Sequence, residues 1–264
     1  MKRFGLFVAV LLGLLVRPVM ADTLVLVQGY RGDAGSWRGT GITHLLLRYG
    51  WQDGGHFSAV SGQVVRWPGF VRVKAGGDRF YTIDLPTEAP ITMQTAILAR
   101  YIDQVSALHK DEPLHVAGHS AGGVVARAAM VGPVGSKIST LITIASPHRG
   151  TGAAETGLSV SNSPLGWFAP MVGAGTINRS RGLYLQLVRE RPGTYLGWLN
   201  RQKHPKARYV SIVRTGYDDV VPAWSQDLNG VVQLAGKAET YPVAGRHQLS
   251  IHDGMTIHNV LLKK

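Results

Sequence analysis

The chain has no cysteine among its 264 residues. It can therefore form no disulfide bond, and it lacks the Cys-rich spacing of a structural zinc site. We accordingly predict no metal and no cofactor, and we expect stability to come from a hydrophobic core. A content of 45% hydrophobic and only 17% charged residues is typical of a globular chain and excludes an intrinsically disordered one.

Acidic residues are scarce as well. Only 16 Asp and Glu stand against 28 Lys and Arg, which gives a formal net charge of +12 at pH 7. A basic excess attracts nucleic acids or anionic surfaces. The chain has no dense basic run interleaved with aromatic residues, and the nearest, residues 201–208, is expected to be a solvated loop. We predict no nucleic-acid partner, and a peripheral contact with membrane or lipid surfaces.

Long hydrophobic runs are also missing. The longest, residues 4–16, has 13 residues and is too short to span a bilayer comfortably. Lys2 and Arg3 precede this run, and small or apolar residues at 19–21 resemble a cleavage site, so we predict a signal peptide over residues 1–21. An uncleaved membrane anchor is the alternative. The mature chain would be exported to the periplasm or secreted, with a net charge of +9 from 25 basic and 16 acidic residues.

Residues 22–264 are predicted to form a single α/β domain, because short β-rich runs alternate with helical stretches, as in a mostly parallel sheet. Apolar residues recur at helical spacing between 92 and 109, for example. The expected strands are 23–28, 79–84, 114–117, 138–145, 208–214 and 239–243. The expected helices are 40–49, 92–109, 123–131 and 256–262, with a surface hairpin inside 57–78.

A long insertion at residues 152–205 separates two of these strands. It is rich in large apolar residues, among them Leu165, Trp167, Phe168 and Tyr184. A long apolar connection of this kind is typical of a cap or lid over a pocket. The alternative is a set of additional core helices that make no contact with a substrate.

The most informative motif is Gly118-His119-Ser120-Ala121-Gly122, which follows an apolar run and precedes a helical one. This Gly-x-Ser-x-Gly pattern predicts a tight turn between strand and helix that exposes the Ser120 hydroxyl as a nucleophile. The flanking glycines allow the sharp turn. The backbone amide of Ala121, at the start of the helix, would be free to face an oxyanion.

A serine nucleophile needs an imidazole to take its proton and a carboxylate to orient that imidazole. Asp218 and Asp219 follow the expected strand 208–214, so either can lie at its carboxyl end, and we expect the other to cap the loop. The base can be His247, just past the last expected strand, or His252. His258 falls inside the last helix and is expected to be packed.

Four segments resemble the α/β-hydrolase superfamily and, within it, bacterial lipases and esterases. The first is residues 25–30, followed by Trp37, with Gln28 where family members usually have a histidine. The second is the Ser120 motif. The third is Thr-Ile-Ala-Ser-Pro-His-Arg-Gly-Thr at 143–151, and the fourth is Asp-Asp-Val-Val-Pro at 218–222 with a later histidine.

The resemblance implies a mostly parallel sheet flanked by helices, with a cap or lid insertion. It selects Asp218 as the acid and His247 as the base. It also implies that the backbone amides of Tyr30 and Ala121 form the oxyanion hole. His119 and His148 occupy positions where the family often has histidine, and we expect them to shape the loops.

We therefore expect a serine carboxylester hydrolase that is lipase-like and cleaves acylglycerols or related lipid esters through an acyl-enzyme on Ser120. An acyltransferase with the same three residues is one alternative, because an alcohol can replace water. A non-catalytic envelope-binding protein on a hydrolase scaffold is another, and Gln28 is its only support.

Overall fold

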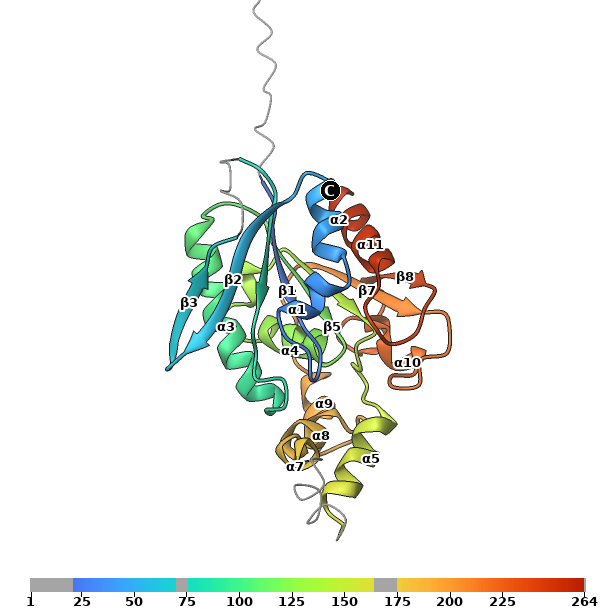
Figure 1. The fold of residues 1–264 in the computed structure, drawn as a ribbon. Coiled ribbons are helices and arrows are strands. Elements are labelled where there is room, and N and C mark those ends of the chain that lie inside the picture. Colours follow the sequence, from blue (N-terminus) through green and yellow to red (C-terminus); the bar gives the residue numbers. More distant parts are fainter. Residues whose placement is uncertain (1–20, 70–75, 164–174, 264) are drawn as a thin grey trace, which may run out of the picture.

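In the computed structural model, which describes residues 21–69, 76–163 and 175–263, one eight-stranded sheet runs through the molecule (Figure 1). The strand order is β3-β2-β4-β1-β5-β6-β7-β8, and every neighbouring pair is parallel except β2–β3. The predicted mostly parallel sheet is confirmed. The strands are β1 (Thr23–Val27), β2 (Gln52–Val60), β3 (Gln63–Trp67), β4 (Arg79–Ile83), β5 (Leu114–His119), β6 (Thr140–Ile144), β7 (Arg208–Arg214) and β8 (Ala238–Val243).

Helices cover both faces of the sheet, and Figure 1 shows α2 beside α11. The helices of the described residues are α1 (Gly35–Gly39), α2 (Ile42–Arg48), α3 (Ile91–Leu108), α4 (Ala121–Met130), α5 (Gly152–Ser161), α7 (Thr176–Arg179), α8 (Arg181–Leu187), α9 (Tyr195–Leu199), α10 (Ala223–Gln226) and α11 (Ile251–Leu262). Two 3₁₀ turns are η1 (Gly135–Lys137) and η3 (Leu228–Gly230).

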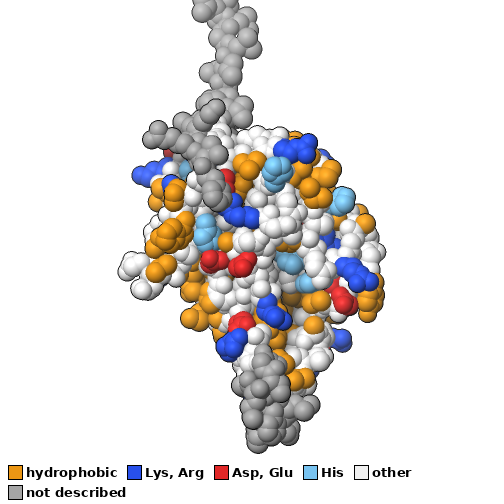
Figure 2. Space-filling view, in the orientation of Figure 1, with side chains coloured by type: hydrophobic (Ala, Val, Ile, Leu, Met, Phe, Trp, Pro, Cys, Tyr) orange, Lys and Arg blue, Asp and Glu red, His pale blue; other side chains and the backbone are white. Residues whose placement is uncertain are grey.

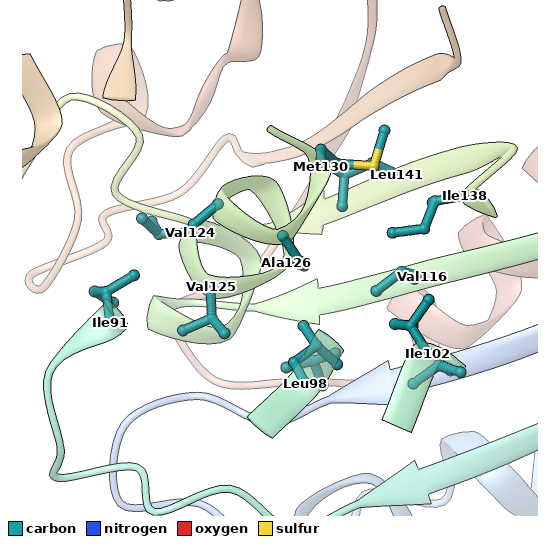
Figure 3. Close-up of a cluster of buried hydrophobic side chains, with 14 of the residues drawn as sticks. Ile91, Leu98, Ile102, Val116, Val124, Val125, Ala126, Met130, Ile138 and Leu141 are labelled. Atoms are coloured by element: carbon teal, nitrogen blue, oxygen red, sulfur yellow. The ribbon is translucent and has the colours of Figure 1, made fainter. Parts of the chain in front are cut away.

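The central strands are apolar along their whole length because both of their faces are buried. In β1, Leu24 and Leu26 pack with side chains of α1, α2 and α11. The alternate residues Val25 and Val27 pack with α3 and α4 on the opposite face. Figure 3 shows this second layer, where Leu98 and Ile102 of α3 lie near Val116 of β5.

Three predicted boundaries were wrong. The predicted helix 40–49 corresponds to α2, which begins only at Ile42, because Gly41 before it has φ +78°, in the left-handed region that favours glycine; the short helix α1 at 35–39 was not predicted. The predicted helix 123–131 begins at Ala121, directly after the serine. The predicted helix 256–262 begins at Ile251, because Ser250 and Asp253 form a capping box there.

The surface hairpin also differs from the prediction. It pairs β2 with β3, and the sequence did not suggest β2, whose residues 52–60 include Asp53, Gly54 and Gly55. These residues disfavour strands locally. Parallel pairing with β4, interrupted by a register shift between Asp53 and Gly55, overrides that preference.

The segment between β6 and β7 holds α5, α7, α8 and α9, which lie together beyond one end of the sheet (Figure 1). Leu183, Leu187 and Leu199 of these helices are buried and contact the same core cluster as α3 and α4. Predicted cap residues 164–174 lie outside the described residues, as do residues 1–20 of the predicted signal peptide.

The face drawn in Figure 2 carries basic side chains that are scattered among acidic and apolar ones. Among the described helices, none has both the length and the hydropathy needed to cross a bilayer.

Two residues of α3 should differ in how much stability the protein loses when each is replaced by alanine. Leu98 is fully buried, whereas Met93 is 55% exposed. Leu98→Ala should lower the free energy of unfolding by about 2–5 kcal/mol, because it leaves a cavity under the sheet. Met93→Ala should change it by less than about 0.5 kcal/mol. Urea unfolding followed by circular dichroism measures both, and equal losses would contradict this description of the core.

Candidate active site

Ser120 occupies a single-residue turn between the end of β5 and the start of α4. Its φ is +53° and its ψ is −128°, a conformation that costs about 1–3 kcal/mol for a residue with a Cβ. A hydrogen bond from the Ser120 amide to the Ile144 carbonyl (2.8 Å) holds the turn against the neighbouring strand. The side chain is only 7% exposed. The predicted tight turn between strand and helix is therefore present at this position.

The glycines around Ser120 allow backbone segments to approach closely. A Cβ on Gly118 would lie 2.6 Å from the Cα of Gly123, and one on Gly122 would lie 2.2 Å from the carbonyl oxygen of Gln28. Gly123, which the motif does not include, has the same constraint, because its Cβ would lie 2.0 Å from Ser146 Oγ. The turn thus packs directly against the loop that begins at Gln28.

The structure brings Ser120, His247 and Asp218 into one chain of hydrogen bonds. His247 Nε2 lies 2.8 Å from Ser120 Oγ, and His247 Nδ1 lies 3.0 Å from Asp218 Oδ2. The three residues follow β5, β8 and β7, whose carboxyl ends lie at the same edge of the sheet. This is the edge where open parallel sheets bind ligands.

Asp218 is held by four hydrogen-bond donors. Its Oδ1 accepts from the amides of Val220 and Val221 (both 2.9 Å), and its Oδ2 accepts from His247 and from Gln226 Nε2 (3.0 Å). Burial alone would raise the pKa of Asp218, but the hydrogen bonds from His247 and the two amides outweigh it and lower the pKa.

The neighbouring acid has no such environment. Asp219 is exposed, and the loop-capping role expected for the residue that does not face the histidine belongs to Asp218 itself. One carboxylate therefore caps the loop with one oxygen and contacts His247 with the other.

The loop that carries His247 is fixed from two sides. His119 Nε2 donates to the carbonyl oxygen of His247 (2.8 Å), and Arg214 Nη2 donates to that of Gln248 (2.9 Å). His252 is exposed in the first turn of α11. His258 lies within that helix, stacked on a tyrosine ring, and accepts a hydrogen bond from an indole N–H.

A cavity of about 540 Å³ opens over Ser120. Tyr30 and Ala121, the two residues expected to supply oxyanion amides, line it together with Ser120 and His247. Its other walls are mostly apolar and come largely from α5, α8 and the Asp218 loop; they include Ala153, Ala154, Leu183, Leu187 and Val221. The insertion 152–205 therefore contributes both to the core and to this cavity.

Two contacts attach the loop after β1 to its surroundings. The Tyr30 hydroxyl is 2.7 Å from that of Tyr184 on α8. Gln28 is buried, and its amide donates to Ile83 O (2.9 Å) and accepts from Leu85 N (2.8 Å) in the orientation that satisfies both atoms. Gln28 stands where members of the resembled family usually have a histidine. Its side chain is thus hydrogen-bonded to the backbone at and just after the end of β4.

The segment 143–151 connects the sheet to the α9 region and to the Asp218 loop. His148 Nε2 contacts Thr143 Oγ1 (3.0 Å), and the His148 carbonyl accepts from the side chain of Asn200, just after α9 (3.1 Å). Thr151 caps α5 and also donates to the carbonyl of Val220. These bonds give His148 the loop-shaping role that was expected.

Among the described residues there is no group of three or more His, Cys, Asp or Glu side chains arranged to hold a metal ion. His115 and His119 have the i, i+4 spacing of helical zinc ligands, but both lie in β5. In a strand that spacing separates the residues by about 13 Å.

Comparisons with known proteins agree with this fold. The family described as "PGAP1-like alpha/beta domain" matches residues 80–160. The product of the lin2722 gene of Listeria innocua superposes with a TM-score of 0.63 at 14% identity, over 92% of this chain and 95% of that one. The mature lipase BlEst2 of Bacillus licheniformis superposes with a TM-score of 0.61 at 16% identity, over 92% and 91%. The chain has the α/β-hydrolase fold.

A metagenomic carboxyl esterase, MGS0156, is also similar to this α/β-hydrolase fold, with a TM-score of 0.54 at 14% identity over 87% of this chain and 65% of that one. A sequence comparison with curated proteins finds no relative. At these identities the likeness establishes the fold, as the motifs implied, and the chemistry has to be argued from the site.

The close approach of the serine turn to Gln28 predicts the effect of an added methyl group. Gly122→Ala should destabilise the protein by about 1–3 kcal/mol, because the Gln28 carbonyl cannot move without shifting the adjacent loop. Gly132→Ala, just beyond α4, is the matched control, since its Cβ would meet nothing closer than 3.4 Å. Chemical denaturation compares the two, and equal stabilities would contradict the proposed close packing.

Burial of His119 predicts acid sensitivity. Burial lowers the pKa of His119 from 6.5 to about 4, so the unfolded chain binds this proton more readily than the folded one. The stability this group contributes is present above pH 6.5 and is lost as the pH falls toward 4, by about 3 kcal/mol in total.

His119→Gln can still donate to the His247 carbonyl but does not titrate. The variant should therefore lose less stability between pH 7 and pH 4.5 in urea unfolding. An unchanged pH dependence would show that His119 is not the group responsible.

Proposed function

We propose that the protein is a serine carboxylester hydrolase in which Ser120 is the nucleophile, His247 the general base and Asp218 the acid that orients it. The observation that carries the proposal is the continuous hydrogen-bond chain from Asp218 through His247 to Ser120. This is the arrangement that a serine hydroxyl needs in order to lose its proton as it attacks.

The reaction follows from these positions. Ser120 Oγ attacks the ester carbonyl carbon while His247 Nε2 takes its proton, and the Asp218 carboxylate stabilises the resulting imidazolium. The backbone amides of Tyr30 and Ala121 receive the negative charge on the substrate oxygen. His247 then protonates the leaving alcohol. Water, activated in the same way, releases the acid from the acyl-enzyme.

The substrate we propose is a lipid ester, such as an acylglycerol. An acyl chain needs an apolar wall, which the side chains of Ala154, Leu183 and Leu187 supply beside Ser120. The neighbours named as a lipase and a carboxyl esterase have the same fold. We further propose that the chain is exported and touches lipid surfaces peripherally, on the basis of the predicted signal peptide and the basic net charge.

The nucleophile is tested with p-nitrophenyl esters from acetate to palmitate. Ser120→Ala should lower kcat by about 10⁶-fold, because no other group takes over the attack. Activity equal to that of the unaltered protein would reject the assignment. A preference for the short esters would reject the lipid substrate while leaving the reaction class in place.

Matched pairs of neighbouring residues test the acid and the base. Asp218→Asn should lower kcat by about 10⁴-fold, whereas Asp219→Asn should leave it within about twofold, since Asp219 is exposed. His247→Ala should abolish turnover and His252→Ala should not. The reverse result in either pair would exchange the assignments.

The same assay, repeated with an added alcohol, separates hydrolysis from acyl transfer. Free acid as the main product supports a hydrolase. Predominant transfer to the alcohol at low acceptor concentration would support the acyltransferase alternative.

A further inference from the structure

Gln226 is a buried amide that no motif singles out. It is the last residue of the short helix α10 and is only 1% exposed. Its Oε1 accepts from the backbone amide of Arg214 (2.8 Å), at the end of β7. Its Nε2 donates to Asp218 Oδ2 (3.0 Å) and to the Val221 carbonyl (2.7 Å). The side chain therefore links the end of β7 to both sides of the Asp218 loop.

The backbone determines which way this amide points. The Arg214 N–H can only donate, so it must face the amide oxygen of Gln226, and the Val221 carbonyl can only accept, so it must face the nitrogen. The Gln226 side chain therefore presents its N–H group, and not its carbonyl oxygen, to the Asp218 carboxylate. Both amide protons are used, and a buried polar group satisfied in this way is rigid.

The bond also completes the coordination of the carboxylate. An ionised carboxylate offers about four lone-pair sites. Val220, Val221 and His247 occupy three of them, and Gln226 occupies the fourth, on the same oxygen that faces His247. Without Gln226, the only remaining hydrogen bond to Oδ2 would come from His247, the residue that Asp218 orients.

We propose that Gln226 is a positioning residue: its amide holds the Asp218 carboxylate against rotation, so that Oδ2 stays aimed at Nδ1 of His247. This inference rests on the proposed function of those two residues. Gln226 lies outside the residues that line the cavity over Ser120, so it acts through Asp218 and not on the substrate.

The charged groups named around this site come from four segments: β7, α11, the loop after β8 and the Asp218 loop. His247 faces Asp218 from the loop after β8. The guanidinium of Arg214 forms a buried ion pair with Asp253 of α11 (2.6 Å). Asp219, from the Asp218 loop itself, is exposed. Gln226 is thus a neutral donor to a carboxylate whose main charged neighbour is the histidine.

Gln226→Leu tests the positioning role by removing the donor while keeping the volume. It should lower kcat by about tenfold to a hundredfold with KM within about twofold, because a small displacement of the base costs rate without changing the cavity. A carboxylate with one donor fewer also holds the imidazolium proton more tightly. The acid limb of the kcat/KM profile should therefore move to higher pH.

Gln226→Glu adds a rescue that depends on pH. A protonated carboxyl can donate its O–H to Asp218 while its other oxygen accepts from the Arg214 amide, whereas an ionised one has no donor and repels Asp218. The variant should approach the activity of the unaltered protein in acid and lose it as the pH rises. Gln226→Leu should show no such recovery.

Asn229→Leu is the matched control. Asn229 lies three residues later, in η3, and its amide bonds to the backbone of β8 at Ala238 (2.9 Å), without contact to Asp218. This variant should lose stability but keep its kcat and pH profile. If Gln226→Leu retains full kcat and an unshifted profile, or if Asn229→Leu shows the same changes, the positioning role is wrong.

A measurement without substrate separates this inference from the proposed function. The carboxyl ¹³C signal of Asp218 should titrate at higher pH in Gln226→Leu than in the unaltered protein, since the ionised form has lost a donor. An unchanged titration overturns the inference even if the ester assays succeed. A raised titration without any esterase activity supports the inference and places the failure with the proposed function.

Discussion

The pair of hydrogen bonds that joins Ser120 to His247 and His247 to Asp218 depends on the sheet beneath it. Ser120 and His247 are separated by 127 residues, and they meet only because β5, β6, β7 and β8 pair in parallel and in register. Each of the three residues follows the carboxyl end of one of these strands. A slip in any of these pairings would displace one of the three residues from the others.

The loops that present these residues are fixed by buried polar groups rather than by regular structure. His119, kept neutral by burial, bonds to the backbone of the His247 loop. Arg214 and Asp253, an ion pair exposed by only 1% and 0%, connect that loop to α11. Taking such a pair out of water costs several kcal/mol per ion, so its benefit lies in orientation more than in stability.

Much of this arrangement could be predicted from the sequence, because the decisive signals are local. The Gly-x-Ser-x-Gly pattern indicated the tight turn at Ser120, and close backbone contacts at its glycines give the steric reason expected for them. Positions just after strands narrowed the acid to Asp218 or Asp219 and the base to His247 or His252, and the family resemblance selected Asp218 and His247. The alternation of strands and helices indicated the parallel sheet, and the β5, β6 and β7 segments were anticipated to within about two residues.

Other features of the fold and of the site could not be predicted, because they depend on contacts that form only in the folded chain. Strand β2 has residues that disfavour a strand and forms because β4 is available to pair with it. Gln226 shows no pattern, since its role arises only when α10 folds back under the Asp218 loop. We expected the aspartate that does not face His247 to cap the loop, but Asp218 does both. The sequence cannot show this, because two adjacent carboxylates differ only in the direction in which the loop points them.

Covalent labelling of the nucleophile tests the central claim most directly. A fluorophosphonate reacts with a serine whose hydroxyl is activated by a base and whose oxyanion is stabilised. Intact mass and peptide mapping should show one adduct per chain, located on Ser120, and none in the Ser120→Ala variant. A chain that stays unlabelled, or that carries its adduct on another residue, would contradict the assignment of Ser120 as an activated nucleophile.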